Sequence, residues 1–417
     1  MAGYLPLKKF HHMTDAGTAE RRYQARLNAE TTLHLGVELH GYPLFYVPTP
    51  EIAVLMEQIQ ATERNLAVKL AAFPKDSQQA ILRLQLLDEI VYSNEIESIH
   101  TTRKDVQLAL DLRQPRFREV ALLYQQVFEG GDVAEAGATT AFPTSLEEIR
   151  SVYDRIMEGE LSAADHPDGR LFRAGPVTIG SGTRKVHQGF HPESTIEHGL
   201  TQWLRLVGGA PHEKPEAHEK AQPSTISALL GHLLFELIHP FYDGNGRTGR
   251  FLLSSQLLGP LGEPTALALS KAINTAPRAY YKAFGEVEHP LNRAEATGFV
   301  HTMLGIIAAA QRDVDELLTD KRAQLAALES YAQAAASSDA ATRALLVALG
   351  HSFIFDATPR LPLPTLAEGA GVSAATARAR LKDMEREGVV TTPSLRPLTF
   401  RLTDKGRNLL GLSSSAP

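Results

Sequence analysis

A helix–loop–helix segment in the middle of the chain constrains the fold more than any other part of the sequence. It runs His239-Pro-Phe-Tyr-Asp-Gly-Asn-Gly-Arg-Thr-Gly-Arg250 and follows a strongly apolar stretch, residues 226–238. Proline cannot continue a helix, so we expect the first helix to end at Pro240. The glycines that follow allow positive φ angles and close backbone approach, and we expect the second helix to begin near Arg247. The chain must therefore accommodate two helices joined by a tight, glycine-rich turn.

The same segment contains the groups needed to hold a phosphate. Successive N–H groups of such a turn form an anion-binding concavity, and the positive end of the next helix points at it. Arg247 and Arg250 supply guanidinium groups suited to phosphate oxygens. Asp243 is an oxygen ligand of the kind that Mg²⁺ prefers, and His239 can accept a proton near neutral pH. Gly-Asn-Gly alone is typical of a plain helix–helix turn, but the full set indicates phosphoryl or nucleotidyl transfer.

The composition is that of a soluble protein. The chain has 417 residues, of which 43% are hydrophobic and 22% charged, with a net charge of −6 and no cysteine. The lack of cysteine excludes disulfides, thiolate nucleophiles and Cys-ligated zinc. No apolar run approaches the ~20 residues needed to span a bilayer, and the N-terminus lacks a signal-peptide pattern. We therefore expect a cytoplasmic protein with no membrane contact.

Apolar residues at three- and four-residue spacing predict helices along most of the chain. We expect an N-terminal helical region over residues 1–125, a core over 126–331 and a separate small domain over 342–410. Alternating apolar residues before a Gly-Ser-Gly turn predict a β-hairpin over residues 176–190. The predicted fold class is therefore mainly α, with a small hairpin in the core.

The segment at 239–250 resembles the signature of Fic-domain proteins. That signature is His-x-Phe-x-(Asp/Glu)-Gly-Asn-Gly-Arg-x-x-Arg, and the chain matches it at every specified position. The resemblance covers roughly residues 80–330, since the helical context on both sides is also similar. It implies a Fic-type helical core that transfers AMP from ATP to a Ser, Thr or Tyr hydroxyl of a target protein or of itself.

The resemblance also implies a role for each residue of the segment. His239 would deprotonate the target hydroxyl, Asp243 would hold Mg²⁺ against the ATP phosphates, and Arg250 would contact the γ-phosphate. The attacked atom would be the α-phosphorus, with pyrophosphate as the leaving group. The remaining nucleotide-binding residues would be Gly244, Asn245, Gly246, Arg247, Thr248 and Gly249.

Two further regions have counterparts in the family. The hairpin at 176–190 lies where Fic proteins have a flap that pairs with the backbone of the target as an added strand. Asn274, Tyr280 and Tyr281 fall where adenosine-pocket residues are often found. Each region has a simpler alternative. The hairpin can be an ordinary surface hairpin, and the tyrosines can be core residues of a helix.

An upstream segment resembles the inhibitory helix of many Fic proteins. Ser93 and Glu97 lie four residues apart, hence on one face of a helix expected near residues 88–100. They match the family pattern (Ser/Thr)-x-x-x-Glu-(Gly/Asn), whose Glu pairs with the second motif arginine and blocks productive ATP placement. The resemblance therefore implies an inhibitory Glu97–Arg250 pair, against the alternative of a solvated carboxylate. Ser98 replaces the usual Gly or Asn and favours the left-handed conformation less than Gly does, so we expect the helix to continue further.

Residues 342–410 resemble a winged helix-turn-helix domain. A short helix, a tight turn, a Ser373 cap and a second helix are followed by a strand and a closing helix. The segment has ten basic and six acidic residues within a chain of negative net charge. Thr376, Arg378 and Arg380 are placed to contact DNA bases or phosphates. Protein docking or dimerisation through this domain is the alternative.

Three other functions are compatible with the sequence. His232, Glu236 and His239 lie on one helical face, as in a metalloenzyme, but no further ligand cluster accompanies them, so His232 is better explained as a packed neighbour of the loop. A second is a DNA-binding transcriptional regulator with a Fic-like sensor core. In the third, the same fold transfers another group or removes AMP, with Glu97 assisting a water molecule. No motif identifies the target protein, a DNA site or a homodimer.

Overall fold

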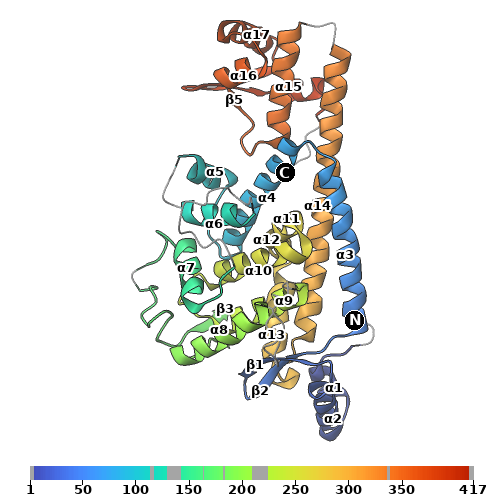
Figure 1. The fold of residues 1–417 in the computed structure, drawn as a ribbon, viewed down its shortest axis with the longest axis vertical. Coiled ribbons are helices and arrows are strands. Elements are labelled where there is room, and N and C mark those ends of the chain that lie inside the picture. The colour runs from blue at the N-terminus through green and yellow to red at the C-terminus, as the bar shows by residue number, and fades with distance from the viewer. Residues whose placement is uncertain are drawn as a thin grey trace, which may run out of the picture. The chain divides into compact units, whose positions relative to one another are not determined.

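The chain folds into two compact units that share three long helices (Figure 1). The first unit comprises residues up to 66 together with 85–312, and the second comprises residues 67–84 and those from 313 onward. No helix of the described residues is long and apolar enough to cross a membrane. The computed structural model describes residues 4–112, 117–128, 142–162, 164–181, 184–208, 224–335 and 339–412.

Helices dominate both units, which confirms the predicted fold class. The helices shared between the units are α3 (Pro50–Ala71), α4 (Lys75–Ile96) and α14 (Thr297–Ala334). The helices of the first unit are α1 (Leu7–Met13), α2 (Ala16–Leu27), α5 (Arg103–Leu112), α6 (Arg118–Phe128), α7 (Leu146–Ile156), α8 (Glu193–Val207), α9 (Thr225–Ile238), α10 (Asn245–Leu261), α11 (Glu263–Ala266), α12 (Leu269–Thr275) and α13 (Pro277–Glu288), with a 3₁₀ turn, η1 (Pro290–Asn292).

The N-terminal region also contains a β-hairpin. Strands β1 (Leu33–Leu39) and β2 (Tyr42–Tyr46) pair antiparallel, and buried residues alternate with exposed ones along the second half of β1. The N–H of Phe45 donates to the carbonyl of Ala294 at 3.2 Å. The helical region expected over 1–125 is therefore interrupted here. The local sequence does carry a signal for this hairpin, since apolar residues alternate along β1 at Leu33, Leu35, Val37 and Leu39 and Gly41 follows at the turn.

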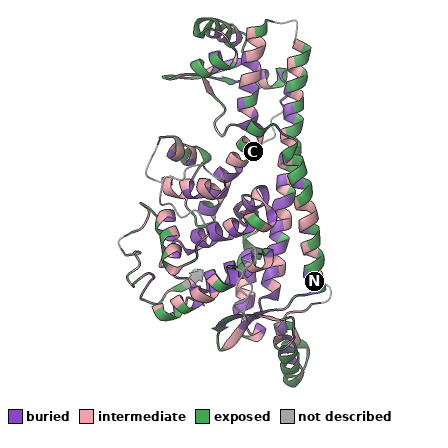
Figure 2. Cartoon of the chain, in the orientation of Figure 1, coloured by how far each residue is buried: buried purple, intermediate pink, exposed green. Residues whose placement is uncertain are grey.

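Two buried helices, α9 and α10, form the centre of the first unit (Figure 2). Helix α9 is apolar on all sides, which is typical of a helix surrounded by protein. Trp203 of α8 donates from Nε1 to the carbonyl of Gly231 at 2.9 Å. A side chain at Gly231 would collide with Val207, so the glycine permits this close helix contact. This contact holds the middle of α9 against α8, and the glycine-rich loop begins further along the chain, after Ile238.

The hairpin predicted over residues 176–190 is present. It consists of β3 (Thr178–Ser181) and β4 (Arg184–Gln188), which pair antiparallel. Just after β4, the N–H of Phe190 donates to the carbonyl of Ile238 at 3.0 Å. This bond connects the base of the hairpin to the last residue of α9, so hairpin and loop are neighbours.

The second unit contains the predicted winged helix-turn-helix. Its sheet consists, in spatial order, of β5 (Leu361–Pro362), β7 (Leu398–Leu402) and β6 (Val390–Leu395). Ser373 caps the second helix of the motif by accepting from the N–H of Thr376 at 3.1 Å, and the preceding turn uses a positive φ of 64° at Gly371. This unit extends beyond the predicted 342–410, since it comprises residues 67–84 and those from 313 onward. Its own elements are α15 (Ala340–Phe355), β5 (Leu361–Pro362), α16 (Leu363–Gly369), α17 (Ala374–Arg386), β6 (Val390–Leu395), β7 (Leu398–Leu402) and α18 (Asp404–Leu409).

Candidate active site

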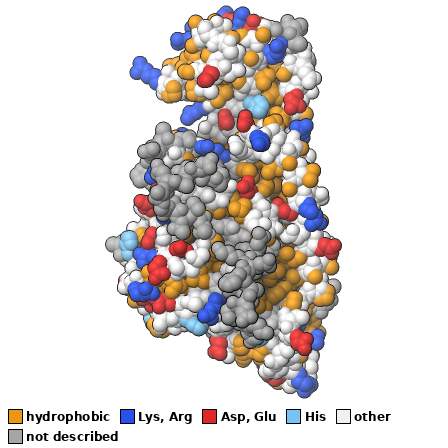
Figure 3. All heavy atoms as spheres, in the orientation of Figure 1, with side chains coloured by type: hydrophobic (Ala, Val, Ile, Leu, Met, Phe, Trp, Pro, Cys, Tyr) orange, Lys and Arg blue, Asp and Glu red, His pale blue; other side chains and the backbone are white. Residues whose placement is uncertain are grey.

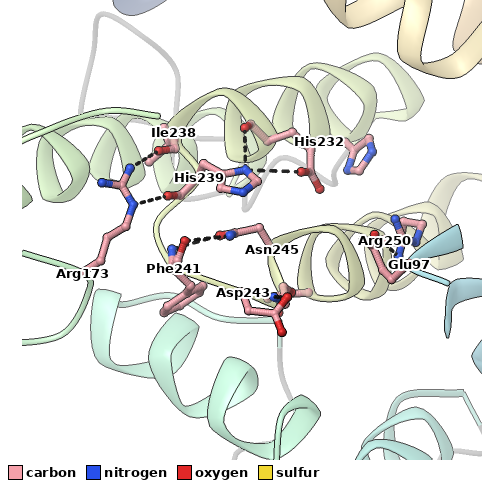
Figure 4. A network of polar contacts seen from close by, with 12 residues as sticks. Glu97, Arg173, His232, Ile238, His239, Phe241, Asp243, Asn245 and Arg250 are labelled. Carbon is pink, nitrogen blue, oxygen red and sulfur yellow. Dashed lines mark hydrogen bonds and ion pairs between the residues drawn. The ribbon is translucent and has the colours of Figure 1, made fainter. Parts of the chain in front are cut away.

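The loop between α9 and α10 is held in shape by its own asparagine (Figure 4). Asn245 accepts from the N–H of Phe241 at 3.0 Å and donates to the carbonyl of the same residue at 2.8 Å. The chain turns with positive φ at His239 (51°) and Gly244 (78°). Asn245, predicted to line an anion site, thus shapes the loop through its side chain. Helix α10 begins at Asn245, two residues before the predicted start.

Two of the loop glycines are required by close contacts rather than by a positive φ. A Cβ atom on Gly246 would collide with the carboxylate of Glu97, and one on Gly249 would collide with the carboxyl group of Glu236. Of the three glycines, only Gly244 has positive φ. The motif therefore leaves room for two acidic side chains beside the first turn of α10.

His239 and Asp243 lie at opposite ends of the loop. The Nδ1 atom of His239 is 3.3 Å from the carbonyl oxygen of Glu236, so the contact requires a hydrogen on Nδ1. The carboxylate of Asp243 accepts from the N–H of Gly244 at 2.7 Å, and the residue is exposed. A single exposed carboxylate beside N–H groups that can face phosphate fits the way Mg²⁺ is bound with nucleotides.

Arg250, the last residue of the signature, is buried and bound by the end of α4. Its guanidinium donates to the hydroxyl of Ser93 at 3.0 Å, to the carbonyl of Ser93 at 2.9 Å and to the carboxylate of Glu97 at 2.8 Å. Burial opposes the charge of Arg250, but Glu97 and the other acidic groups nearby outweigh it and raise its pKa. The predicted Glu97–Arg250 contact is therefore present. Because the Glu97 side chain is 36% exposed, this pair is only half-buried.

The end of α4 differs from the sequence expectation. The helix ends at Ile96, and Ser98 has a positive φ of 61°. The expectation that the helix continues past Ser98 is wrong. Ser98 takes the left-handed conformation that is usual for Gly after a helix, which strains its backbone. Glu97 is the first residue after α4, and its side chain contacts Arg250 from there.

Arg247 is held by a residue that the sequence did not indicate. Its guanidinium is buried and forms an ion pair with Glu160. Arg247 is predicted to contact phosphate, and here its position is set by this carboxylate. Glu160 lies 87 residues earlier in the chain in a turn without a motif, so no sequence signal points to it.

A third buried arginine, Arg173, likewise has no signal in the sequence. It is fully buried and donates to the carbonyls of His239 at 2.8 Å, Gly175 at 2.6 Å and Phe190 at 2.7 Å. These carbonyls belong to the loop and to the two ends of the hairpin segment. Arg173 therefore connects the hairpin segment through hydrogen bonds to His239, the predicted base.

The remaining predicted residues lie around α13. Tyr280 is buried and its hydroxyl is 2.8 Å from Nε2 of His232, whereas Tyr281 is exposed. Asn274 donates to Glu95 at 3.0 Å. Burial and the charge of Arg250 lower the pKa of His232 to about 3, so His232 is a neutral, packed residue.

The metalloenzyme alternative finds no support in this geometry. His232 faces Tyr280, and within the described residues no group of three His, Cys, Asp or Glu side chains is placed to hold a metal ion.

Comparison with known proteins identifies both parts of the chain. Residues 143–257 match the model of the Fic/DOC family, and residues 353–391 match that of winged helix-turn-helix DNA-binding domains. A probable protein adenylyltransferase from Aquifex aeolicus (strain VF5) is 39% identical over 59 residues, which span 14% of this chain and 15% of that protein.

Several solved structures are similar in outline. A Fic family protein from Desulfovibrio desulfuricans G20 is 21% identical, with a TM-score of 0.48, covering 87% of this chain and 98% of that one. A Fic domain containing signaling protein from Bacteroides thetaiotaomicron VPI-5482 is 15% identical, with a TM-score of 0.41, covering 63% and 97%.

The loop, all of α9 and α10 up to residue 257 lie within the part of the chain that matches the Fic/DOC family. The family match includes the entire segment at 239–250. This chain carries a Fic/DOC family domain together with a C-terminal winged helix-turn-helix domain.

Proposed function

We propose that the protein transfers AMP from ATP to a Ser, Thr or Tyr hydroxyl of a target protein, and that Glu97 restrains this activity. The observation that carries the proposal is the placement of His239, Asp243 and the first turn of α10 around one short loop. The hydroxyl oxygen attacks the α-phosphorus, and its proton passes to His239. The bond from the α-phosphorus to the bridging oxygen of the β-phosphate breaks, and pyrophosphate leaves.

Residues of the loop support each part of this reaction. Because Nδ1 of His239 faces a carbonyl oxygen, Nε2 is the basic nitrogen of the ring. The N–H groups at the start of α10 would bind phosphate oxygens. Asp243 would hold Mg²⁺, which would offset the negative charge of the ATP phosphates when bound.

The inhibitory role of Glu97 follows from its contact with the guanidinium of Arg250. The family resemblance assigns the γ-phosphate to Arg250, and the guanidinium of Arg250 is bound here by Ser93 and Glu97. A carboxylate at this position competes with the γ-phosphate and repels it. The protein as folded is thus a restrained enzyme.

The target would dock on the hairpin formed by β3 and β4. Within the described residues this sheet has two strands only, so its outer edges offer N–H and carbonyl groups for an added strand. Arg173 connects the hairpin to His239, which would bring a hydroxyl in the added strand close to the base.

The test uses α-labelled ATP, Mg²⁺ and a cell lysate, with wild type, Glu97→Gly and Glu97→Gly/His239→Ala. We expect Glu97→Gly to label protein at least roughly tenfold more than wild type, and the double variant to label none. A parallel reaction with γ-labelled ATP should give no label, which separates AMP transfer from phosphoryl transfer. Glu57→Gly, at an exposed position of α3, is the matched control and should behave as wild type.

Two results would overturn the proposal. One is labelling by Glu97→Gly that persists without His239. The other is a folded Glu97→Gly variant that labels no more protein than wild type. Loss of label from a modified target on adding wild-type protein would instead support removal of AMP.

The winged helix supports a second function, DNA binding. Thr376 and Arg378 are exposed on α17, as contact with duplex DNA requires, whereas Arg380 pairs with Asp339 at 3.2 Å. On the face shown in Figure 3, basic and acidic side chains are interspersed over this unit rather than gathered in one patch. Duplex binding that weakens in Arg378→Ala would support this function, and binding unaffected by that change would count against it.

A further inference from the structure

A buried carboxyl group next to the predicted base has no part in the reaction described so far. Glu236 lies one turn before His239 on α9, and its side chain is 13% exposed. One carboxyl oxygen is 4.0 Å from Nδ1 of His239. The other is buried and has no hydrogen-bond partner. Burying a carboxyl oxygen without a partner is unfavourable, so a role for this group is to be expected.

The loop is built to accommodate this carboxyl group. A side chain at Gly249 would collide with it, so the glycine keeps the space beside α10 open. The separation of 4.0 Å between Nδ1 of His239 and the carboxyl oxygen of Glu236 is longer than a hydrogen bond. Catalytic hydrogen bonds are often long before substrate binds and tighten in the reacting complex.

We propose that Glu236 is a positioning residue for His239. Its carboxylate accepts the Nδ1 hydrogen, which keeps Nε2 directed at the target hydroxyl, and it stabilises the imidazolium formed when His239 takes the proton. This inference rests on the proposed AMP transfer. Glu236 would then act as the third group that orients a histidine base, an arrangement known from other enzymes.

The charge of Glu236 depends on the inhibitory contact. Around Glu236 lie Arg250 of α10, Glu97 after α4, and Tyr280 and Tyr281 of α13. On its own helix, His232 lies one turn before it, and His239, the residue that follows α9, lies one turn after it. Burial, with a contribution from Glu97, raises its pKa to about 8, while Arg250 lowers it. The carboxylate form exists above that pKa, so at neutral pH the restrained protein holds Glu236 mainly protonated. Removing Glu97 lowers the pKa and favours the carboxylate. Glu97 would therefore weaken the base as well as occupy Arg250.

The experiment compares Glu97→Gly with Glu97→Gly/Glu236→Gln, because glutamine keeps the shape and removes the charge. We expect kcat for labelling to fall roughly tenfold, with KM for ATP changed less than about twofold. The pH profile should lose the rise that follows ionisation of Glu236. An equal kcat and an unchanged profile in the two proteins would overturn the proposal.

A second measurement does not depend on activity. The pKa of the His239 ring, followed by NMR, should fall by about one unit when Glu236→Gln is added to Glu97→Gly, since a carboxylate at this range favours the imidazolium. The same change with Glu97 intact should have a smaller effect. No difference in the Glu97→Gly background would refute the role of Glu236. If Glu97→Gly itself labels nothing, the proposed function fails, whereas this NMR result still tests the contact.

Discussion

Replacing Glu97 with alanine should cost the protein little stability, although it removes one partner of an ion pair. The Glu97 side chain is 36% exposed, so solvent weakens its attraction to Arg250. Arg250 keeps two acceptors after the change, the hydroxyl and the carbonyl of Ser93. We therefore expect a loss of about 1 kcal/mol in the free energy of unfolding.

Removing the other partner should cost far more. Arg250→Ala deletes all three hydrogen bonds of a side chain that is 2% exposed. It also leaves a carbonyl of Ser93 and the buried carboxyl of Glu89 without the neighbouring positive charge. Breaking such a buried arrangement typically costs about 3–5 kcal/mol.

Thermal unfolding monitored by circular dichroism measures this asymmetry. For a unit of this size, 1 kcal/mol corresponds to a shift of about 2–4 °C in Tm. We expect a shift in that range for Glu97→Ala and one several times larger for Arg250→Ala. Equal shifts would show that Glu97 holds the fold together and would refute its assignment as a mainly regulatory group.

Three further changes have defined outcomes. Arg173→Ala removes donors to four backbone carbonyls and should lower the free energy of unfolding by about 3 kcal/mol and reduce labelling, as measured by urea unfolding and the ATP assay. Ser98→Gly relieves the positive φ of 61° and should raise Tm, with a gain of about 0.5–1 kcal/mol. Glu160→Gln leaves the buried Arg247 without its ionic partner and should destabilise the fold by about 3 kcal/mol, visible in thermal unfolding.

A specific result would contradict each of these three predictions. Wild-type labelling by Arg173→Ala would show that the hairpin does not need this attachment. A lower Tm for Ser98→Gly would mean that the serine makes a contact worth more than its strain. An unchanged Tm for Glu160→Gln would show that Arg247 finds an equal partner elsewhere.

The sequence by itself determined the features that depend on neighbouring residues. The end of α9 before Pro240, the glycine-rich turn, the hairpin before α8 and the Ser373 cap follow from local backbone chemistry, and all are present. The contact of Glu97 with Arg250 was predicted through the family pattern rather than through any physical signal in the chain.

Only the tertiary structure decided which distant groups surround the loop. Glu160 on Arg247 and Arg173 on the carbonyl of His239 join segments far apart in sequence. Neither segment has a pattern that reveals its partner, because such contacts arise from packing of helices and loops already formed. The bond from the hairpin at residues 33–46 to Ala294 is also long-range, whereas the hairpin itself follows from the local alternation of apolar residues. The sequence thus predicted the residues of the proposed reaction, and the fold decided how each is held and which charges act on it.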